Sequence, residues 1–231
     1  MPPRRKIHHY EADSITISYE RRRCTHALEC IRRQPEVFNL TRRRWIDATL
    51  ASADDIARAI EECPTGALQY RRKDGKPEEA VPERNAARSS ALGPINLHGN
   101  LEIHAPDQPP VMETRVALCR CGESANQPFC DNSHEAAMFQ EAGTAQPLQS
   151  KVESATGPLR VLPLENGPCF IGGNFTLHDS NGVELGICGP VTQLCRCGRS
   201  KTQPFCDRAH LTTGFEAPGL SKEYIQRLLG L

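Results

Sequence analysis

Two segments of the chain repeat one arrangement of cysteines and a histidine. Each segment reads Cys-x-Cys-x8-Cys-x3-His. The predicted ligands are Cys119, Cys121, Cys130, His134, Cys195, Cys197, Cys206 and His210. Thiolate sulfur and imidazole nitrogen bind both zinc and iron-sulfur clusters. Each segment therefore predicts one metal centre with three cysteine ligands and one histidine ligand.

The residues between these ligands repeat as well. Arg120 and Arg196 stand inside the Cys-x-Cys pairs, and both copies continue with Gly, Ser, Gln-Pro-Phe and Asp at equivalent places. An extended Cys-x-Cys segment points both side chains to one face. Asp131 and Asp207 are suited to cap a helical turn that carries the histidine. We expect three thiols and one imidazole to converge there, with nearby backbone amides stabilising negative sulfur.

Spacing alone leaves the kind of centre open, because three cysteines and one histidine also suit a structural zinc site. Zinc modules usually bring Cys-x2-4-Cys pairs from two separate knuckles. Here one pair is Cys-x-Cys and each ligand set lies within sixteen residues. We favour an iron-sulfur centre and keep a zinc-stabilised protein-interaction module as the alternative.

A third group of cysteines lies in the N-terminal part of the chain. Cys24, Cys30 and Cys63, the last followed by proline, resemble the Cys-x2-Cys-x2-Cys and Cys-Pro pattern of mono-cluster ferredoxins. Ala27 stands where that pattern has its second cysteine. Three thiolates predict a [3Fe-4S] cluster. A fourth ligand, for which His26 is the candidate, would complete [4Fe-4S].

Composition limits the class of protein. The chain has 231 residues, 17 glycines and 18 prolines but only 5% aromatic residues, so we expect loops and several modest cores. The 28 basic residues balance the 28 acidic residues, which argues against a general binder of nucleic acids or anionic membranes. No apolar run forms a secretory signal or reaches membrane-spanning length, so we expect a cytoplasmic protein. In a reducing cytosol, 11 cysteines favour metal ligation over disulfides.

Local patterns predict the elements around the N-terminal cysteines. Ser52 or Asp54 can cap a helix whose apolar positions recur at spacings of three and four and end in Cys63. Residues 15–19 and 67–70 alternate between apolar and polar side chains and are predicted to pair as strands. Helix and strands would then flank the cysteine loop.

Composition and repetition divide the chain into four parts. Residues 1–78 form the N-terminal domain, the polar segment 79–90 is a linker, and residues 91–148 and 149–231 form the two repeats. Each repeat contains Gly-Asn-apolar-x-apolar-His before its cysteines. We match Gly93-Pro94 with Gly157-Pro158 as the starts of the repeats. The offsets between matched positions then differ, which implies insertions in the loops.

The repeated motif resembles the CDGSH iron-sulfur family, which holds a [2Fe-2S] cluster with three cysteines and one histidine. This resemblance implies two [2Fe-2S] clusters, each bound by one of the two ligand sets named above. Asn132 and Arg208 replace the glycine of the family signature. Asparagine tolerates a positive φ better than arginine does. The backbone geometry at Arg208 is therefore where the second copy should depart from the family pattern, although its ligands match. Residues 10–75 resemble the divergent mono-cluster ferredoxin domain often fused to CDGSH modules.

These observations together predict an α+β chain: a small ferredoxin-like N-terminal domain, followed by a β-rich tandem CDGSH unit arranged as a pseudo-two-fold pair. Single-motif relatives form homodimers, so the resemblance implies that a monomer with an internal pseudo-dimer is sufficient. We expect electron transfer or cluster transfer to an unidentified redox partner or acceptor protein, with no binding of nucleic acid or membranes. No nucleophile-base pair, glycine-rich phosphate loop or paired acid motif indicates an enzyme.

Overall fold

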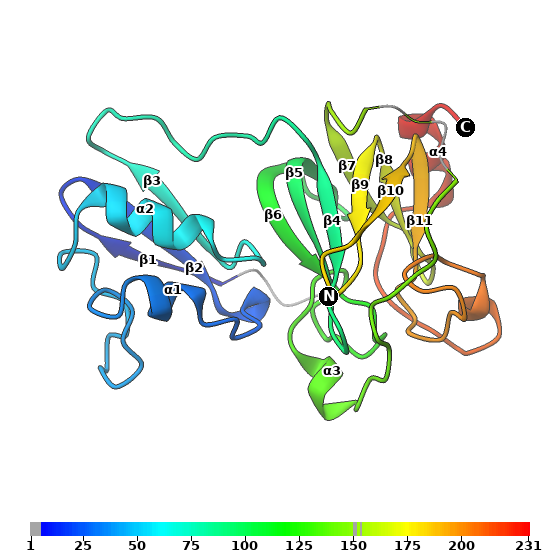
Figure 1. The fold of residues 1–231 in the computed structure, drawn as a ribbon, viewed down its shortest axis with the longest axis horizontal. Coiled ribbons are helices and arrows are strands. Elements are labelled where there is room, and N and C mark those ends of the chain that lie inside the picture. Colours follow the sequence, from blue (N-terminus) through cyan, green and yellow to red (C-terminus); the bar gives the residue numbers. More distant parts are fainter. Residues whose placement is uncertain (1–5, 150–151, 153) are drawn as a thin grey trace. The chain divides into compact units, whose positions relative to one another are not determined.

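The computed structural model describes residues 6–149, 152 and 154–231, and it contains two compact units, residues 1–80 and 81–231 (Figure 1). The chain combines helices and sheets with strands predominating. The small N-terminal unit and the β-rich C-terminal unit confirm the predicted mixed class.

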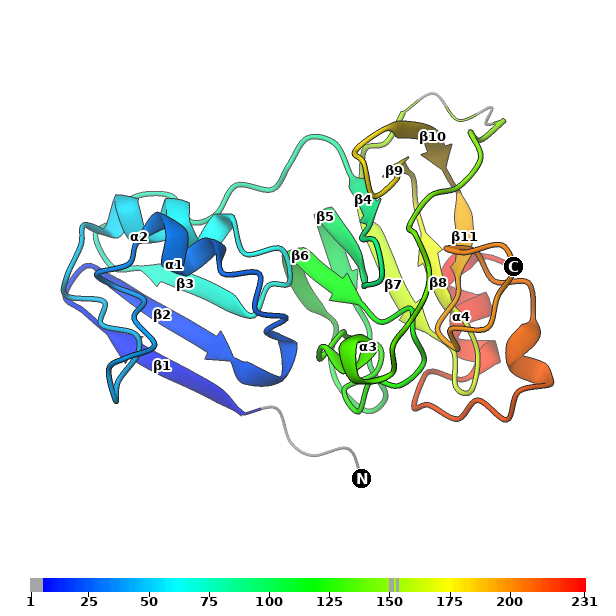
Figure 2. The same ribbon diagram turned by 60° about the horizontal axis from the view of Figure 1, so that its bottom comes forward.

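The first unit is a three-stranded antiparallel sheet covered by two helices. Its strands and helices are β1 (Ile7–Glu11), β2 (Ile15–Glu20), a 3-10 turn (Arg21–Arg23), α1 (Glu29–Arg33), α2 (Ala53–Glu61) and β3 (Leu68–Arg72). The strand order is β1-β2-β3. Figure 2 shows α1 and α2 on the same side of this sheet.

The predicted helix and strand pair are both present in this unit. Ser52 caps α2, because its hydroxyl accepts a hydrogen bond from the backbone N–H of Asp55 at 3.2 Å. Ile17 pairs with Tyr70 in the antiparallel register of β2 and β3. One face of α2 is buried against β2 and β3 in a shared core, and Cys63 follows the end of the helix.

The second unit is built around one eight-stranded sheet. Its strands are β4 (Ala86–Ser89), β5 (Ile95–Ile103), β6 (Val111–Leu118), β7 (Leu159–Pro163), β8 (Cys169–Gly172), β9 (Phe175–His178), β10 (Glu184–Cys188) and β11 (Val191–Leu194). Its helical segments are α3 (Ser133–Ala136), a 3-10 turn (Ala209–Leu211) and α4 (Lys222–Leu229). Among the described residues, none of the helices is long and apolar enough to cross a membrane.

The two repeats exchange strands within this sheet. The order is β10-β9-β4-β5-β7-β8-β11, with β6 paired to β5. β4 pairs antiparallel with β5 of its own repeat and parallel with β9 of the other. β7 likewise pairs antiparallel with β8 and parallel with β5. Each repeat therefore supplies a strand that completes the sheet of the other repeat.

Part of the predicted linker 79–90 is a strand, which corrects that boundary. Asn85 is 1% exposed, accepts a hydrogen bond from the N–H of Asn100, and donates to the carbonyls of Gly157 and Asn174. Ala87 and Ser89 are buried on one face of β4. Residues 79–90 are polar in composition, yet they include a short strand with alternating buried and exposed residues, and one of its two partner strands, β9, is distant in the sequence.

The structure also corrects the match between the repeats. Gly93 and Gly167 occupy equivalent positions, because their carbonyls accept hydrogen bonds from Arg120 and Arg196 respectively. Gly157 instead precedes β7, the counterpart of β4. Gly167-Pro168, not Gly157-Pro158, is therefore the counterpart of Gly93-Pro94.

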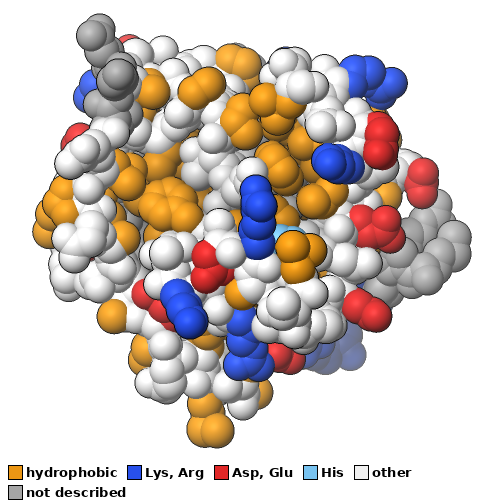
Figure 3. All heavy atoms as spheres, turned by 90° about the vertical axis from the view of Figure 1, so that its right-hand side faces the viewer, with side chains coloured by type: hydrophobic (Ala, Val, Ile, Leu, Met, Phe, Trp, Pro, Cys, Tyr) orange, Lys and Arg blue, Asp and Glu red, His pale blue; other side chains and the backbone are white. Residues whose placement is uncertain are grey.

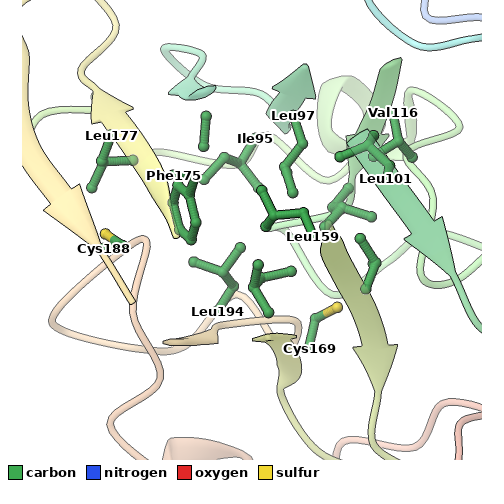
Figure 4. Close-up of a cluster of buried hydrophobic side chains, with 14 of the residues drawn as sticks. Ile95, Leu97, Leu101, Val116, Leu159, Cys169, Phe175, Leu177, Cys188 and Leu194 are labelled. Atoms are coloured by element: carbon green, nitrogen blue, oxygen red, sulfur yellow. The ribbon is translucent and has the colours of Figure 1, made fainter. Parts of the chain in front are cut away.

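One hydrophobic core lies between the repeats. Figure 4 shows Phe175 beside Ile95, with Leu159 and Leu194 pointing into the same interior. Cys169 and Cys188 belong to this core, and burial raises the pKa of each thiol to about 12. These two cysteines are core residues that pack among aliphatic side chains.

Candidate metal centres

The four predicted ligands of the first repeat form two close pairs. The Sγ atoms of Cys119 and Cys121 lie 3.6 Å apart, as expected for an extended Cys-x-Cys segment after β6. The Sγ atom of Cys130 lies 3.4 Å from Nδ1 of His134, in the first turn of α3. Nδ1 is therefore the imidazole nitrogen that faces the cysteines.

The second repeat reproduces both pairs. The Sγ atoms of Cys195 and Cys197 lie 3.7 Å apart after β11, and the Sγ atom of Cys206 lies 3.5 Å from Nδ1 of His210. His210 belongs to the 3-10 turn that takes the place of α3. The distances agree between repeats to within a tenth of an ångström.

Each pair has the spacing of two ligands on one tetrahedral metal ion. Metal–sulfur bonds of about 2.3 Å put two sulfurs about 3.8 Å apart, and a metal–nitrogen bond of about 2.0 Å puts sulfur and nitrogen about 3.5 Å apart. Within the described part of the chain, no group of three or more Cys, His, Asp or Glu side chains is arranged to hold one metal ion. Each repeat thus presents two ligand pairs, and the spacing within each pair suits one metal ion.

Burial and hydrogen bonding act oppositely on these thiols. In each Cys-x-Cys pair one thiol has a lowered pKa, about 7 for Cys119 and about 6 for Cys197, mainly because the partner thiol donates a hydrogen bond. Burial raises the pKa of Cys130 to about 12. A bound cation is what keeps such buried sulfurs deprotonated, so the donor set fits a metal cluster.

The residue before each histidine-bearing turn has a left-handed backbone conformation. Asn132 and Arg208 have φ of 75° and 71°, so both occupy the left-handed region expected at the signature's glycine position. They, rather than the aspartates, are the N-cap residues. Asp131 and Asp207 instead accept hydrogen bonds from the N–H two residues later and from the preceding loop. The N–H of Arg208 donates to Sγ of Cys206 at 3.4 Å.

The Arg208→Gly variant should be more stable than the parent chain by about 1 kcal/mol, because a side chain in the left-handed region costs roughly 1–2 kcal/mol. Glycine keeps the N–H that contacts Cys206. Asn132→Gly is the matched control and should gain less, since asparagine tolerates this conformation. Guanidinium unfolding followed by circular dichroism measures both. A loss of stability in Arg208→Gly would contradict the strain assigned to this position.

The two cysteine loops contact each other through glycines. Gly122 has a φ of 89°, and a Cβ atom built on it would lie 2.6 Å from the carbonyl oxygen of Cys197. Gly198 has a φ of 72°, and its Cβ atom would lie 2.2 Å from the carbonyl oxygen of Cys121. Only glycine permits both the conformation and the approach. The two centres are therefore held next to each other by reciprocal backbone contacts.

Arg120 and Arg196, inside the Cys-x-Cys pairs, are buried structural cations that the motif alone does not explain. They are 1% and 2% exposed. Each donates through Nε to the glycine carbonyl of its own repeat and lies over a phenylalanine ring, Phe139 or Phe215, at 5.6 Å. The presence of arginine at the same place in both repeats indicated a shared role. The sequence could not predict that these side chains are buried and bind a glycine carbonyl.

The three N-terminal cysteines lie around one cavity in the first unit. Its lining residues include Cys24, Ala27, Glu29, Cys30 and Cys63. Burial raises the pKa of Cys30 to about 12, and the negative charges of Cys63 and Cys24 add to this shift. Cys24 follows the 3-10 turn, Cys30 lies in α1 and Cys63 follows α2. Separate elements thus bring the three sulfurs to one place.

His26 is exposed and is not among the residues that line this cavity. Its φ of 54°, together with the φ of 62° at Leu28, turns the loop on both sides of Ala27. Glu29 does line the cavity, but its carboxylate pairs with Arg32 at 2.5 Å. His26 as a fourth ligand stays a prediction, and Ala27, at the sequence position where ferredoxins have a cysteine, lines the cavity.

Comparison with known proteins identifies both parts of the chain. Residues 10–73 match the family described as a divergent 4Fe-4S mono-cluster. Residues 92–135 and 166–211 match the iron-binding zinc finger of CDGSH type. The second segment starts just before Gly167, in agreement with the corrected match between repeats.

Two curated relatives resemble the first unit. Both are named "Uncharacterized protein YjdI", one from Escherichia coli strain K12 and the other from Escherichia coli O157:H7. Each is 33% identical over 64 residues, which is 28% of this chain and 84% of the relative. No solved structure matches the chain. Sequence, ligand geometry and family matches agree: the chain joins a divergent 4Fe-4S mono-cluster domain to two segments of the iron-binding CDGSH type.

Proposed function

We propose that the protein is an electron carrier with two [2Fe-2S] clusters in its second unit and a third iron-sulfur cluster in its first. One observation carries the proposal. In each repeat the ligands form a Cys-Cys pair at 3.6 or 3.7 Å and a Cys-His pair at 3.4 or 3.5 Å. This is the ligand arrangement for two irons, with two protein ligands on each iron. Such clusters supply one-electron redox chemistry when bound.

The same distances weigh against the zinc alternative. A structural zinc ion takes four ligands around a single centre. Here the four ligands of each repeat form two pairs, and the distance within each pair is that between two ligands of one tetrahedral metal ion. Iron and acid-labile sulfide would be absent from a zinc protein, so metal analysis of anaerobically purified protein decides between the two. Zinc without iron or sulfide would refute the electron-carrier proposal.

We further propose that the two repeats form a pseudo-two-fold pair. The exchanged strands β4 and β7, the reciprocal glycine contacts and the matching arginine contacts support this arrangement. A chain with this internal pairing needs no second copy to complete either centre. Sedimentation of the holoprotein as a single chain would agree, whereas a stable dimer that loses its clusters on dilution would not.

For the first unit we propose a [3Fe-4S] cluster held by Cys24, Cys30 and Cys63, within a ferredoxin-like domain. The cavity among these residues and the alanine at the fourth corner support three ligands. The description of the matching family favours the alternative, [4Fe-4S] with a non-cysteine fourth ligand. A [3Fe-4S] signal in the EPR spectrum of the oxidised protein would distinguish the first from the second.

A carrier in which histidine replaces one thiolate should accept an electron at higher potential than a four-cysteine cluster. Rieske centres with two histidines lie at roughly −150 to +300 mV, against about −400 mV for plant-type ferredoxins. His134→Cys adds a negative ligand and should lower the midpoint of its site by on the order of 100 mV. Redox titration followed by visible absorbance measures this. His178→Gln, which changes no proposed ligand, is the control, and equal midpoints in all three proteins would refute the assignment of His134.

We propose a protein partner, either a redox partner or an acceptor of clusters, in the cytoplasm. Basic and acidic residues number 28 each, and Figure 3 shows both kinds interspersed with hydrophobic side chains on one face. Such a surface does not favour nucleic acid or anionic membranes. Transfer of the clusters themselves is the second candidate function. Mixing holoprotein with an apo-ferredoxin separates the two: a carrier keeps its clusters, whereas a donor loses its visible absorbance to the acceptor.

A further inference from the structure

The two buried arginines differ in one respect: only one has an acidic partner. Nη2 of Arg120 donates to the carbonyl of Ser90 at 2.5 Å, and Nη2 of Arg196 donates to that of Leu164 at 2.6 Å. Nη1 of Arg120 binds the carboxylate of Glu141. Nη1 of Arg196 instead donates to the carbonyl of Pro218 at 3.2 Å. Among the described residues, no carboxylate pairs with Arg196.

The difference arises from one position in the sequence. Phe139 and Phe215 lie under equivalent arginines, so two residues later Glu141 in the first repeat corresponds to Ala217 in the second. Ala217 is 7% exposed and has no polar side-chain atom. Glu216, beside it, is exposed to solvent. The second repeat therefore lacks a carboxylate at the place where the first repeat has one.

Glu141 is held in position by contacts that do not depend on the arginine. Its carboxylate also accepts a hydrogen bond from the N–H of Gly143 at 3.1 Å, and its carbonyl accepts one from the N–H of Leu92 at 2.7 Å. The Glu141 side chain is 19% exposed and that of Arg120 is fully buried. A partly buried, fixed charge is screened much less by water and salt than a mobile surface charge.

Both arginines are next to cluster ligands, because each lies between the two cysteines of a Cys-x-Cys pair. In the first repeat the carbonyl of Gly93 binds Arg120, and a Cβ atom on Gly93 would lie 3.6 Å from Nε2 of His134. The Arg120 guanidinium therefore lies near His134 and Cys119 of its own centre, and it is also within electrostatic reach of Cys195 of the other centre. In low-dielectric surroundings such a charge favours the reduced, more negative form of a cluster.

We propose that Glu141 makes the two [2Fe-2S] sites unequal, so that the site bound by Cys195, Cys197, Cys206 and His210 has the higher reduction potential. Glu141 neutralises the buried cation of the first site, whereas the cation of the second site keeps its full charge. The first electron to enter the pair then resides on the second site. This inference rests on the proposed function, because it requires a cluster in both sites.

The test is a redox titration of the holoprotein with dithionite as the electron donor, each site taking up one electron. Iron and sulfide are counted first. The two [2Fe-2S] sites of the parent protein, followed by the EPR signals of their reduced clusters and so told apart from the third cluster, should show two separate midpoints. Glu141→Gln keeps hydrogen-bonding atoms for Gly143 and Arg120 but removes the charge. It should raise the lower midpoint toward the higher one and leave the higher one in place.

Two further variants test the same inference, one as a control and one with the opposite expected shift. Glu216→Gln removes the same charge from the exposed neighbouring position of the other repeat and should move neither midpoint. Ala217→Glu places a carboxylate near Arg196 and should lower the higher midpoint. A single midpoint for both sites of the parent protein, or a shift in Glu141→Gln no larger than in Glu216→Gln, would overturn the inference while the cluster assignment stands. Absence of [2Fe-2S] EPR signals after reduction would overturn the proposed function and this inference together.

Discussion

The Cys130→Ala variant should lose the iron and sulfide of one [2Fe-2S] cluster while the other two centres stay loaded. Cys130 supplies one member of the Cys-His pair in the first repeat, at 3.4 Å from His134. Without it, one iron would keep a single protein ligand, the histidine. Each ligand set comes from one continuous loop, so the loop of the second repeat keeps all four of its ligands.

Iron and sulfide analysis of the purified variant measures this loss, and visible absorbance should fall with it. Cys188→Ala is the matched control, since Cys188 is also buried but lies in the hydrophobic core. It should keep every cluster, although it removes a buried sulfur. Equal losses in the two variants would show that general destabilisation, and not ligation, controls cluster content.

The Ala27→Cys variant should convert the cluster of the first unit from [3Fe-4S] to [4Fe-4S]. Ala27 lines the cavity with Cys24, Cys30 and Cys63, so a thiol at this position can reach the fourth corner. Four thiolates are the usual ligands of [4Fe-4S]. The oxidised protein should lose its [3Fe-4S] EPR signal, and the dithionite-reduced protein should gain a [4Fe-4S] signal.

His26→Ala is the control for this conversion. Its side chain is exposed and does not line the cavity, so its removal should leave the EPR spectra of both oxidation states unchanged. A [4Fe-4S] signal in the parent chain that disappears in His26→Ala would contradict the three-ligand assignment. An unchanged [3Fe-4S] signal in Ala27→Cys would contradict the position assigned to Ala27.

The ligand sets could be predicted from the sequence because their geometry is local. Cys119 and Cys121 are two residues apart in an extended segment, and Cys130 and His134 are one helical turn apart, so spacing alone determines both pairs. The helix capped by Ser52 and the pairing of residues 15–19 with β3 were predictable for the same reason. Short-range patterns contain this information.

The remaining features depend on contacts between distant parts of the chain. β4 resembles a linker in composition, and its strand state depends on β5 and on β9, which lies some ninety residues away. The match of Gly93-Pro94 with Gly157-Pro158 failed because only the contacts of the arginines distinguish Gly157 from Gly167. Glu141 lies outside the motif, so its pairing with Arg120 could not be predicted from spacing.

Low-temperature EPR spectroscopy of anaerobically purified protein, with iron and sulfide counted on the same sample, is the decisive experiment for a [2Fe-2S] cluster held in each repeat by three cysteines and one histidine. We expect a [3Fe-4S] signal in the oxidised protein and two [2Fe-2S] signals after reduction. Iron and sulfide should suffice for all three clusters. A colourless protein that contains zinc and gives no [2Fe-2S] signal after reduction would contradict this assignment.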